Sequence, residues 1–146
     1  MPLRHMKSLV CLLFLVPTLA LAQRYPTSAA TDAKGVSYLG TQYPGRNPPW
    51  LDDVIHTVEP NYPELDRAVR HHGTGMFRLI LDLKTGAVTK VTIIRTTGYG
   101  RLDDCAITAL RQWRWKPGRW KEIGLPVTFN LTPSAPDRTY SGARVQ

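Results

Sequence analysis

The chain has 146 residues, a formal net charge of +8 and 42% hydrophobic residues. This length favours one small folded domain, and only two cysteines exclude a disulfide framework. No aromatic-rich nucleic-acid-binding motif accompanies the basic charge, so we expect no nucleic-acid partner and interpret the charge as attraction to anionic lipid or to acidic segments of a partner.

Residues 1–22 have the order of parts of a secretory signal peptide. Basic residues precede an apolar run over 9–21, which ends in the small-residue triplet 20–22. The run is shorter than the roughly 20 residues of a membrane-spanning helix. We therefore expect export and cleavage before Gln23. If the segment stays uncleaved, it anchors the chain in the inner membrane.

Residues 23–57 predict a flexible lead. Prolines, glycines, serines and threonines dominate the stretch 24–49, which has little apolar periodicity. The apolar island 50–55 is a candidate for docking on the folded domain that follows.

The folded domain is predicted over 58–133 and begins with a helix over 63–72. Acidic residues stand early in this segment, basic residues stand late, and Gly73 ends it, in agreement with the helix dipole and with helix stop signals. Leu65 and Val69 are four residues apart, and this spacing predicts a buried stripe.

A β-hairpin is predicted next. Apolar residues alternate over 76–83, Gly86 supplies a turn, and a second strand covers 88–96. The apolar residues of the second strand change parity near Thr89, which predicts a bulge or a late strand start there.

A second helix is predicted over 102–114, because apolar residues recur on one face of a 3.6-residue period. These residues are Leu102, Ala106, Ala109, Leu110 and Trp113. The pair Pro117-Gly118 prevents the helix from continuing.

The last strand is predicted over 125–131, and residues 134–146 are predicted to form a disordered tail. The order αββαβ predicts an α+β fold, with two helices packed on one face of a three-stranded antiparallel sheet. We expect the last strand to be an edge strand, whose main-chain N–H and C=O groups are available to another chain.

The chemically reactive residues do not predict an enzyme, a cofactor or a metal site. His71-His72 and Asp103-Asp104 are adjacent helical pairs, whose side chains diverge by about 100° and do not converge on one ion or proton. Cys105 is interpreted as a small apolar residue, and Trp113 and Trp115 as anchors of the core.

Four motifs in order resemble the C-terminal domain family of TonB. They are Tyr62-Pro63 before the first helix, the turn segment 82–86, Leu102-Asp103 at the start of the second helix, and the segment 113–118, which reads Trp-Arg-Trp-Lys-Pro-Gly. Together they cover about half of the chain.

The resemblance implies a periplasmic, non-enzymatic module linked to energy-dependent transmembrane transport. In this family the domain binds the TonB-box peptide of an outer-membrane TonB-dependent receptor, which adds as a strand beside the last strand. The positions carried over as peptide-binding residues are Asn61, Tyr62, Pro63, Val127, Thr128, Phe129, Asn130 and Leu131.

The sequence departs from the family at two places. Asn61 stands where well-studied members have a glutamine that contacts the peptide. The anchor helix with a histidine and the long proline-rich spacer of a full TonB protein are not found, so we do not expect energy transduction by this chain alone. The alternative interpretation is a structural envelope protein that uses the same fold for homodimer formation or for contact with the envelope surface.

Overall fold

A computed structural model of the chain describes residues 27–131 and 143–145. The predicted signal peptide, 1–22, lies outside the described residues, as does most of the predicted tail. In chain order the elements are β1 (Ala29–Asp32), β2 (Ser37–Leu39), the 3-10 helix η1 (Gly40–Gln42), α1 (Pro49–Asp52), β3 (Val54–His56), α2 (Glu64–Ala68), β4 (Gly73–Leu81), β5 (Val88–Arg95), α3 (Gly100–Leu110), β6 (Arg114–Trp115), β7 (Trp120–Phe129) and β8 (Ala143–Val145).

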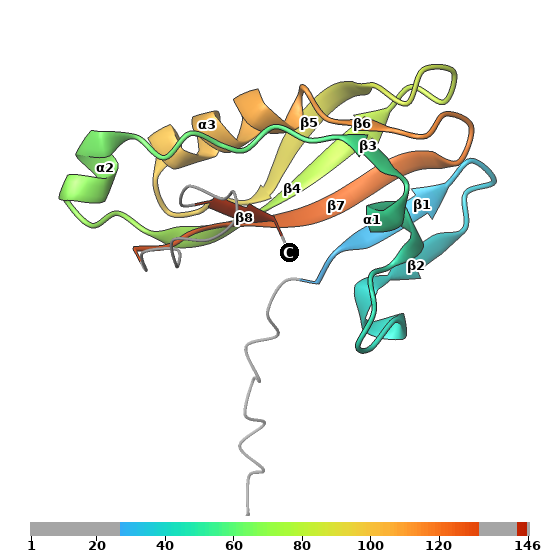
Figure 1. The fold of residues 1–146 in the computed structure, drawn as a ribbon, viewed down its shortest axis with the longest axis horizontal. Helices are drawn as coiled ribbons and strands as arrows, with labels where there is room; N and C mark the ends of the chain where they lie inside the picture. The colour runs from blue at the N-terminus through green and yellow to red at the C-terminus, as the bar shows by residue number, and fades with distance from the viewer. Residues whose placement is uncertain (1–26, 132–142, 146) are drawn as a thin grey trace, which may run out of the picture.

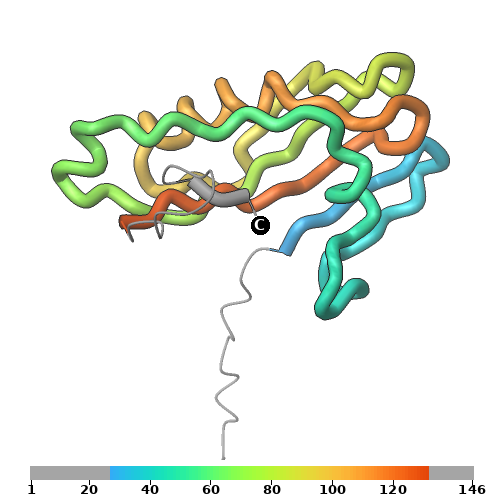
Figure 2. Tube along the Cα trace, in the orientation of Figure 1, coloured from blue at the N-terminus to red at the C-terminus, as the bar shows by residue number. Residues whose placement is uncertain are grey.

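Most strands belong to one antiparallel sheet. Its order is β2-β1-β7-β4-β5, and β8 pairs with β7 outside this path, so the sheet has six strands; β3 and β6 form a separate pair. Figure 1 shows α3 on one face of the sheet, with the segment that leads from β3 to α2 running alongside it. The trace in Figure 2 shows the same two layers.

The predicted α+β class is confirmed at the level of a mixed fold with an antiparallel sheet and few helices. The predicted three-stranded arrangement is wrong. The hairpin β4–β5 and the strand β7 are present, but β1 and β2 extend the sheet beyond β7, and β8 pairs with it as well. Of the two predicted helices, only α3 lies on the sheet, since α2 lies at one end of the molecule (Figure 1).

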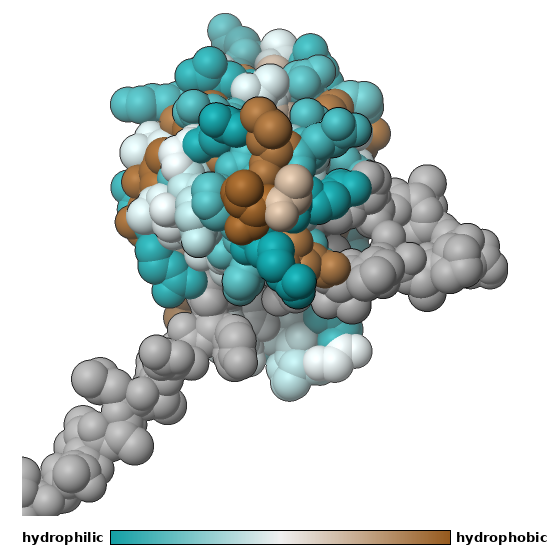
Figure 3. Space-filling view, turned by 90° about the vertical axis from the view of Figure 1, so that its left-hand side faces the viewer, coloured by the Kyte–Doolittle hydropathy of each residue, from teal (hydrophilic) through white to brown (hydrophobic). Residues whose placement is uncertain are grey.

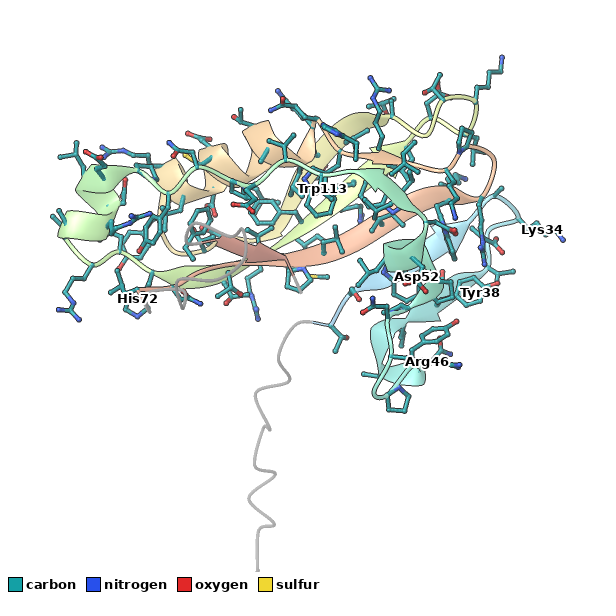
Figure 4. All side chains as sticks on the ribbon, in the orientation of Figure 1. Lys34, Tyr38, Arg46, Asp52, His72 and Trp113 are labelled. Atoms are coloured by element: carbon teal, nitrogen blue, oxygen red, sulfur yellow. The ribbon has the colours of Figure 1, made fainter. Side chains whose placement is uncertain are left out.

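The residues predicted as a flexible lead carry β1, β2, η1, α1 and β3, so that prediction is wrong for the described residues from 27 onward. An aromatic cluster holds them in place. The Trp50 side chain is fully buried, and its ring packs edge-on against that of Trp120, with centroids 5.9 Å apart. Tyr38 (labelled in Figure 4) and Tyr43 add further edge-on contacts, to Trp120 and to Trp50.

The core lies between α3 and the inner face of the sheet. Alternate residues of β4 and β7 are buried there, as their period-two pattern predicts, and so is the predicted apolar face of α3. Fully buried side chains from these elements include Phe77, Leu79, Leu102, Ala106, Leu110, Ile123, Leu125, Val127 and Phe129. The α3 helix ends at Leu110, earlier than predicted, yet Trp113 is buried and its Nε1 donates to the Val58 carbonyl at 2.7 Å.

The bulge predicted near Thr89 is present. Ile80 pairs with Lys90 and Leu81 pairs with Val88, so Thr89 is left as the extra residue of β5. Its hydroxyl donates to the Ile80 carbonyl at 3.1 Å. Because a bulge increases twist and interrupts the ladder, it reduces the capacity of this outer strand to pair with another chain.

The buried stripe predicted for the first helix is wrong, as α2 shows. Leu65 is 69% exposed and Val69 is 60% exposed, whereas Asp66 is buried. The reason is tertiary pairing, because Asp66 accepts hydrogen bonds from Arg101 and pairs with His71. Asp66 therefore turns inward and the apolar residues turn outward. Figure 3 views this end of the molecule and shows a small apolar patch among polar side chains.

Gly86, in the turn between β4 and β5, is expected to be intolerant of a side chain. Its φ is 72°, and a Cβ would collide with the Trp115 carbonyl oxygen. Gly86→Ala should lower the free energy of unfolding by about 2 kcal/mol, through strain and collision together. Gly45 has a φ of 73° but open space around it, so Gly45→Ala should cost only about 1 kcal/mol. Chemical denaturation measures both, and an equal loss would mean that the collision has no effect.

Candidate functional site

The two sides of β7 have different partners. On one side β4 pairs with it from Glu122 to Phe129. On the other side β1 pairs with the first half of β7, from Trp120 to Gly124, and β8 pairs with Val127 to Phe129. The predicted edge strand is therefore wrong in this structure, because the far side of β7 is occupied by strands from both ends of the same chain.

The predicted site residues come from two segments. Asn61, Tyr62 and Pro63 precede α2; Val127, Thr128 and Phe129 lie in β7, followed by Asn130 and Leu131. Both segments reach the same end of the domain, because the Tyr62 and Phe129 rings meet edge-on with centroids 5.4 Å apart. Their contact joins the stretch before α2 to the end of the central strand.

Tyr62 is a structural anchor of this end. Its ring is buried, its hydroxyl donates to the His71 carbonyl at 2.5 Å, and the Arg67 guanidinium lies 5.0 Å from the ring centroid. Burial raises the pKa of the Tyr62 phenol. The hydroxyl therefore stays protonated as a donor at neutral pH, and Tyr62 ties the loop after α2 to the strand.

The side chains from Val127 to Phe129 leave little for a partner to contact. Val127 and Phe129 point into the core and are almost fully buried. Thr128 is half-buried, and its hydroxyl is 2.9 Å from that of Thr74 on β4. Recognition at this position would therefore depend on main-chain N–H and C=O groups, with Asn130 as an exposed polar neighbour.

Asn61 lies on the side of the molecule that carries α3. It lines an open groove between α3 and the segment that precedes α2, together with Arg101, Asp104 and Cys105. The groove holds about 420 Å³. Asn61 is thus adjacent to the buried Tyr62 but on the α3 side of the molecule, so the structure does not bring its side chain together with the far edge of β7.

Cys105 contributes a thiol to the lining of this groove. Burial is the main cause that raises the pKa of the Cys105 thiol, and the nearby carboxylates of Asp66 and Asp104 raise it further. The thiol is therefore protonated at neutral pH and a poor nucleophile. Within 27–131 and 143–145, no three His, Cys, Asp or Glu side chains are grouped so that they could hold a metal ion.

Asp66 is a buried carboxylate near this end. The hydrogen bond with His71 is the largest influence on its pKa and lowers it; burial opposes this, and the Arg101 charge adds to the lowering. The His71 ring also stacks on Tyr99, with centroids 4.0 Å apart. These contacts fix α2 and the Tyr62 segment against α3. Sequence reasoning missed the contacts of Asp66 with Arg101 and of His71 with Tyr99 because these partners are far apart in the chain.

None of the helices within the described ranges is both long enough and apolar enough to span a bilayer.

Comparison with known proteins gives one consistent result. Residues 58–132 match the family model described as the Gram-negative bacterial TonB protein C-terminal. Protein TonB of Neisseria meningitidis serogroup C is 31% identical over 72 residues, which are 49% of this chain and 26% of that protein. Protein TonB of Vibrio cholerae serotype O1 is 30% identical over 84 residues, 53% of this chain and 34% of that protein.

The match is confined to part of these relatives. The chain covers 26% of the Neisseria protein and 34% of the Vibrio protein, well under two thirds of either. No solved structure gives a significant match.

Proposed function

The chain belongs to the family of Gram-negative bacterial TonB C-terminal domains, and from this we propose that it is a periplasmic module that engages outer-membrane TonB-dependent receptors. Residues 1–22 direct its export in this proposal. Its role is to bind a receptor during energy-dependent transport, and other proteins supply the energy. The single observation that carries the proposal is the family match over 58–132.

The binding mode that we propose is strand addition along the far side of β7. A TonB-box peptide of the receptor pairs with the main chain from Val127 to Leu131, and each hydrogen bond contributes about 0.5–1.5 kcal/mol net. The pairing of this side with β8 supports the proposal, because it indicates that the edge accepts an antiparallel strand. Burial of the Val127 and Phe129 side chains keeps the accepting strand rigid.

The charge of the chain suits such a partner. Cleavage before Gln23 removes Arg4 and Lys7 and leaves 17 basic against 11 acidic residues, a formal net charge of +6, which favours encounter with acidic segments. At the Tyr62 end, the exposed cations Arg67 and Arg70 flank the apolar residues Leu65 and Val69. This surface would steer a receptor segment toward the end of β7, and its effect should weaken as salt concentration rises.

The alternative, an envelope protein that self-associates through the same fold, has less support. The outer strand on the other side of the sheet, β5, is interrupted by bulges at Thr89 and near Ile94. It also carries the exposed cations Lys90 and Arg95. Bulges and positive charges are features that prevent strands from pairing edge to edge, so β5 is poorly suited to a homodimer.

Calorimetric titration of a synthetic TonB-box peptide into the full chain tests the proposal. We expect saturable binding with one site per chain. A matched peptide with proline at its centre should bind at least about tenfold more weakly, because proline removes an N–H from the ladder. Equal affinity for the two peptides would contradict strand addition, and binding of neither would contradict the proposed function.

A further inference from the structure

The C-terminal segment of the chain lies on the proposed peptide edge. Its strand β8 pairs antiparallel with β7, with Val145 opposite Val127, Arg144 opposite Thr128 and Ala143 opposite Phe129. Figure 1 shows β8 alongside the end of β7. The sequence predicts disorder for 134–146, so an ordered strand at 143–145 is a correction to that prediction.

Two strands cannot use this edge at the same time. Each residue of β7 directs its N–H and C=O groups to one side, and each group makes one ladder bond. Since β4 pairs with the same residues from the opposite side, a receptor peptide can reach Val127 to Phe129 only where β8 now lies. Binding of that peptide therefore requires β8 to leave.

The geometry makes β8 a competitor that can be displaced. Residues 130–142 join it covalently to β7, which gives it an effective concentration on the order of mM. However, within the described residues β8 covers three residues of β7, and its register stops short of Asn130 and Leu131. A longer peptide that extends over these two residues gains hydrogen bonds that β8 does not make.

We propose that β8 is an autoinhibitory strand that closes the receptor edge of β7 until a receptor peptide replaces it. This inference rests on the proposed function. The apparent dissociation constant equals the intrinsic constant divided by the fraction of molecules with an open edge. If β8 covers the edge in about nine molecules of ten, loss of β8 pairing tightens peptide binding about tenfold.

The test is a pair of double variants of the full chain. Neighbouring residues of a strand direct their N–H groups to opposite sides, so Arg144→Pro with Val145→Pro removes an N–H that faces β7 whichever residue provides it. Arg144→Ala with Val145→Ala changes the same side chains but keeps both N–H groups, and it serves as the matched control.

Two measurements are made on each variant. Of the amides of Val127 to Phe129, those that face β8 should exchange about tenfold faster in the proline variant without any peptide, and at an unchanged rate in the alanine variant. Titration with the TonB-box peptide should show about tenfold tighter binding to the proline variant alone.

The outcomes separate the two claims. Unchanged exchange in the proline variant overturns the inference, whatever the peptide does. Faster exchange with equal peptide affinity in all variants also overturns it, because β8 would then leave the edge without competing. Faster exchange with no peptide binding to any variant overturns the proposed function while supporting a self-closed edge. Faster exchange with tighter binding supports both.

Discussion

Trp115→Ala is expected to lower the free energy of unfolding by about 3–5 kcal/mol, enough to unfold much of a small domain. The Trp115 side chain is fully buried, and its Nε1 donates to the Trp50 carbonyl at 2.7 Å. It joins β6 to α1 and packs beside Trp113, with ring centroids 5.7 Å apart. The substitution therefore leaves a cavity and an unpaired carbonyl at the centre of the molecule.

Urea denaturation followed by circular dichroism measures this effect. Leu65→Ala is the control, because Leu65 is also apolar but 69% exposed, and it should change stability by less than about 0.5 kcal/mol. Similar losses for the two variants would contradict the placement of Trp115 in the core.

Asp53→Ala is the second substitution with a large expected effect, a loss of about 3 kcal/mol. Asp53 is buried, and its carboxylate accepts hydrogen bonds from Arg119 and from Trp120 Nε1, both at 2.8 Å, and from Lys116 at 3.3 Å. Removal leaves the buried indole N–H without its acceptor and releases the loop between β6 and β7. The neighbouring Asp52 is exposed (Figure 4), so Asp52→Ala should have little effect.

The Asp53 carboxylate also makes the stability of the domain depend on pH in the acid range. Burial raises the pKa of Asp53, but hydrogen bonds from Trp120 and Lys116 and the Arg119 charge outweigh it and lower the pKa overall. Because the folded pKa lies below that of the unfolded chain, Asp53 contributes stability above about pH 4, and this is lost as pH falls through the folded pKa. Asp53→Asn should remove this part of the pH dependence. An unchanged acid profile would contradict it.

The elements that were predicted correctly are those whose pattern is local. The alternation of β4 and β7 has a period of two, and the parity change near Thr89 predicts a bulge or a late strand start, of which the structure has the bulge. The apolar face of α3 has the helical period. In each case, the pattern of neighbouring residues predicts which face is buried, so no knowledge of the rest of the chain is needed.

The N-terminal strands could not be predicted in this way. The strands β1 and β2 are four and three residues long, too short for periodicity to show. They are stabilised by pairing, β1 with β7 and β2 with β1, and by packing around Trp120. The aromatic residues Tyr38, Tyr43 and Trp50 were the available signal. A segment that carries three aromatic residues in this spacing is more apolar than a tether requires.

The candidate site was predicted only in part, because local patterns are visible in the sequence and long-range pairing is not. The sequence identified Tyr62 and the end of β7, which the structure brings into contact. It failed for α2, where the distant Arg101, together with the nearby His71, draws Asp66 inward against the apolar pattern. It also could not foresee β8, because three residues near the C-terminus form a strand only when β7 is already in place.

The central claim is that a receptor peptide adds as a strand to the far side of β7, and interstrand nuclear Overhauser effects test it most directly. The full chain is isotope-labelled and saturated with unlabelled TonB-box peptide. We predict contacts between peptide main-chain protons and those of Val127 to Leu131, with loss of the contacts between β7 and β8. Peptide contacts confined to β5, or to the groove beside α3, would contradict the account.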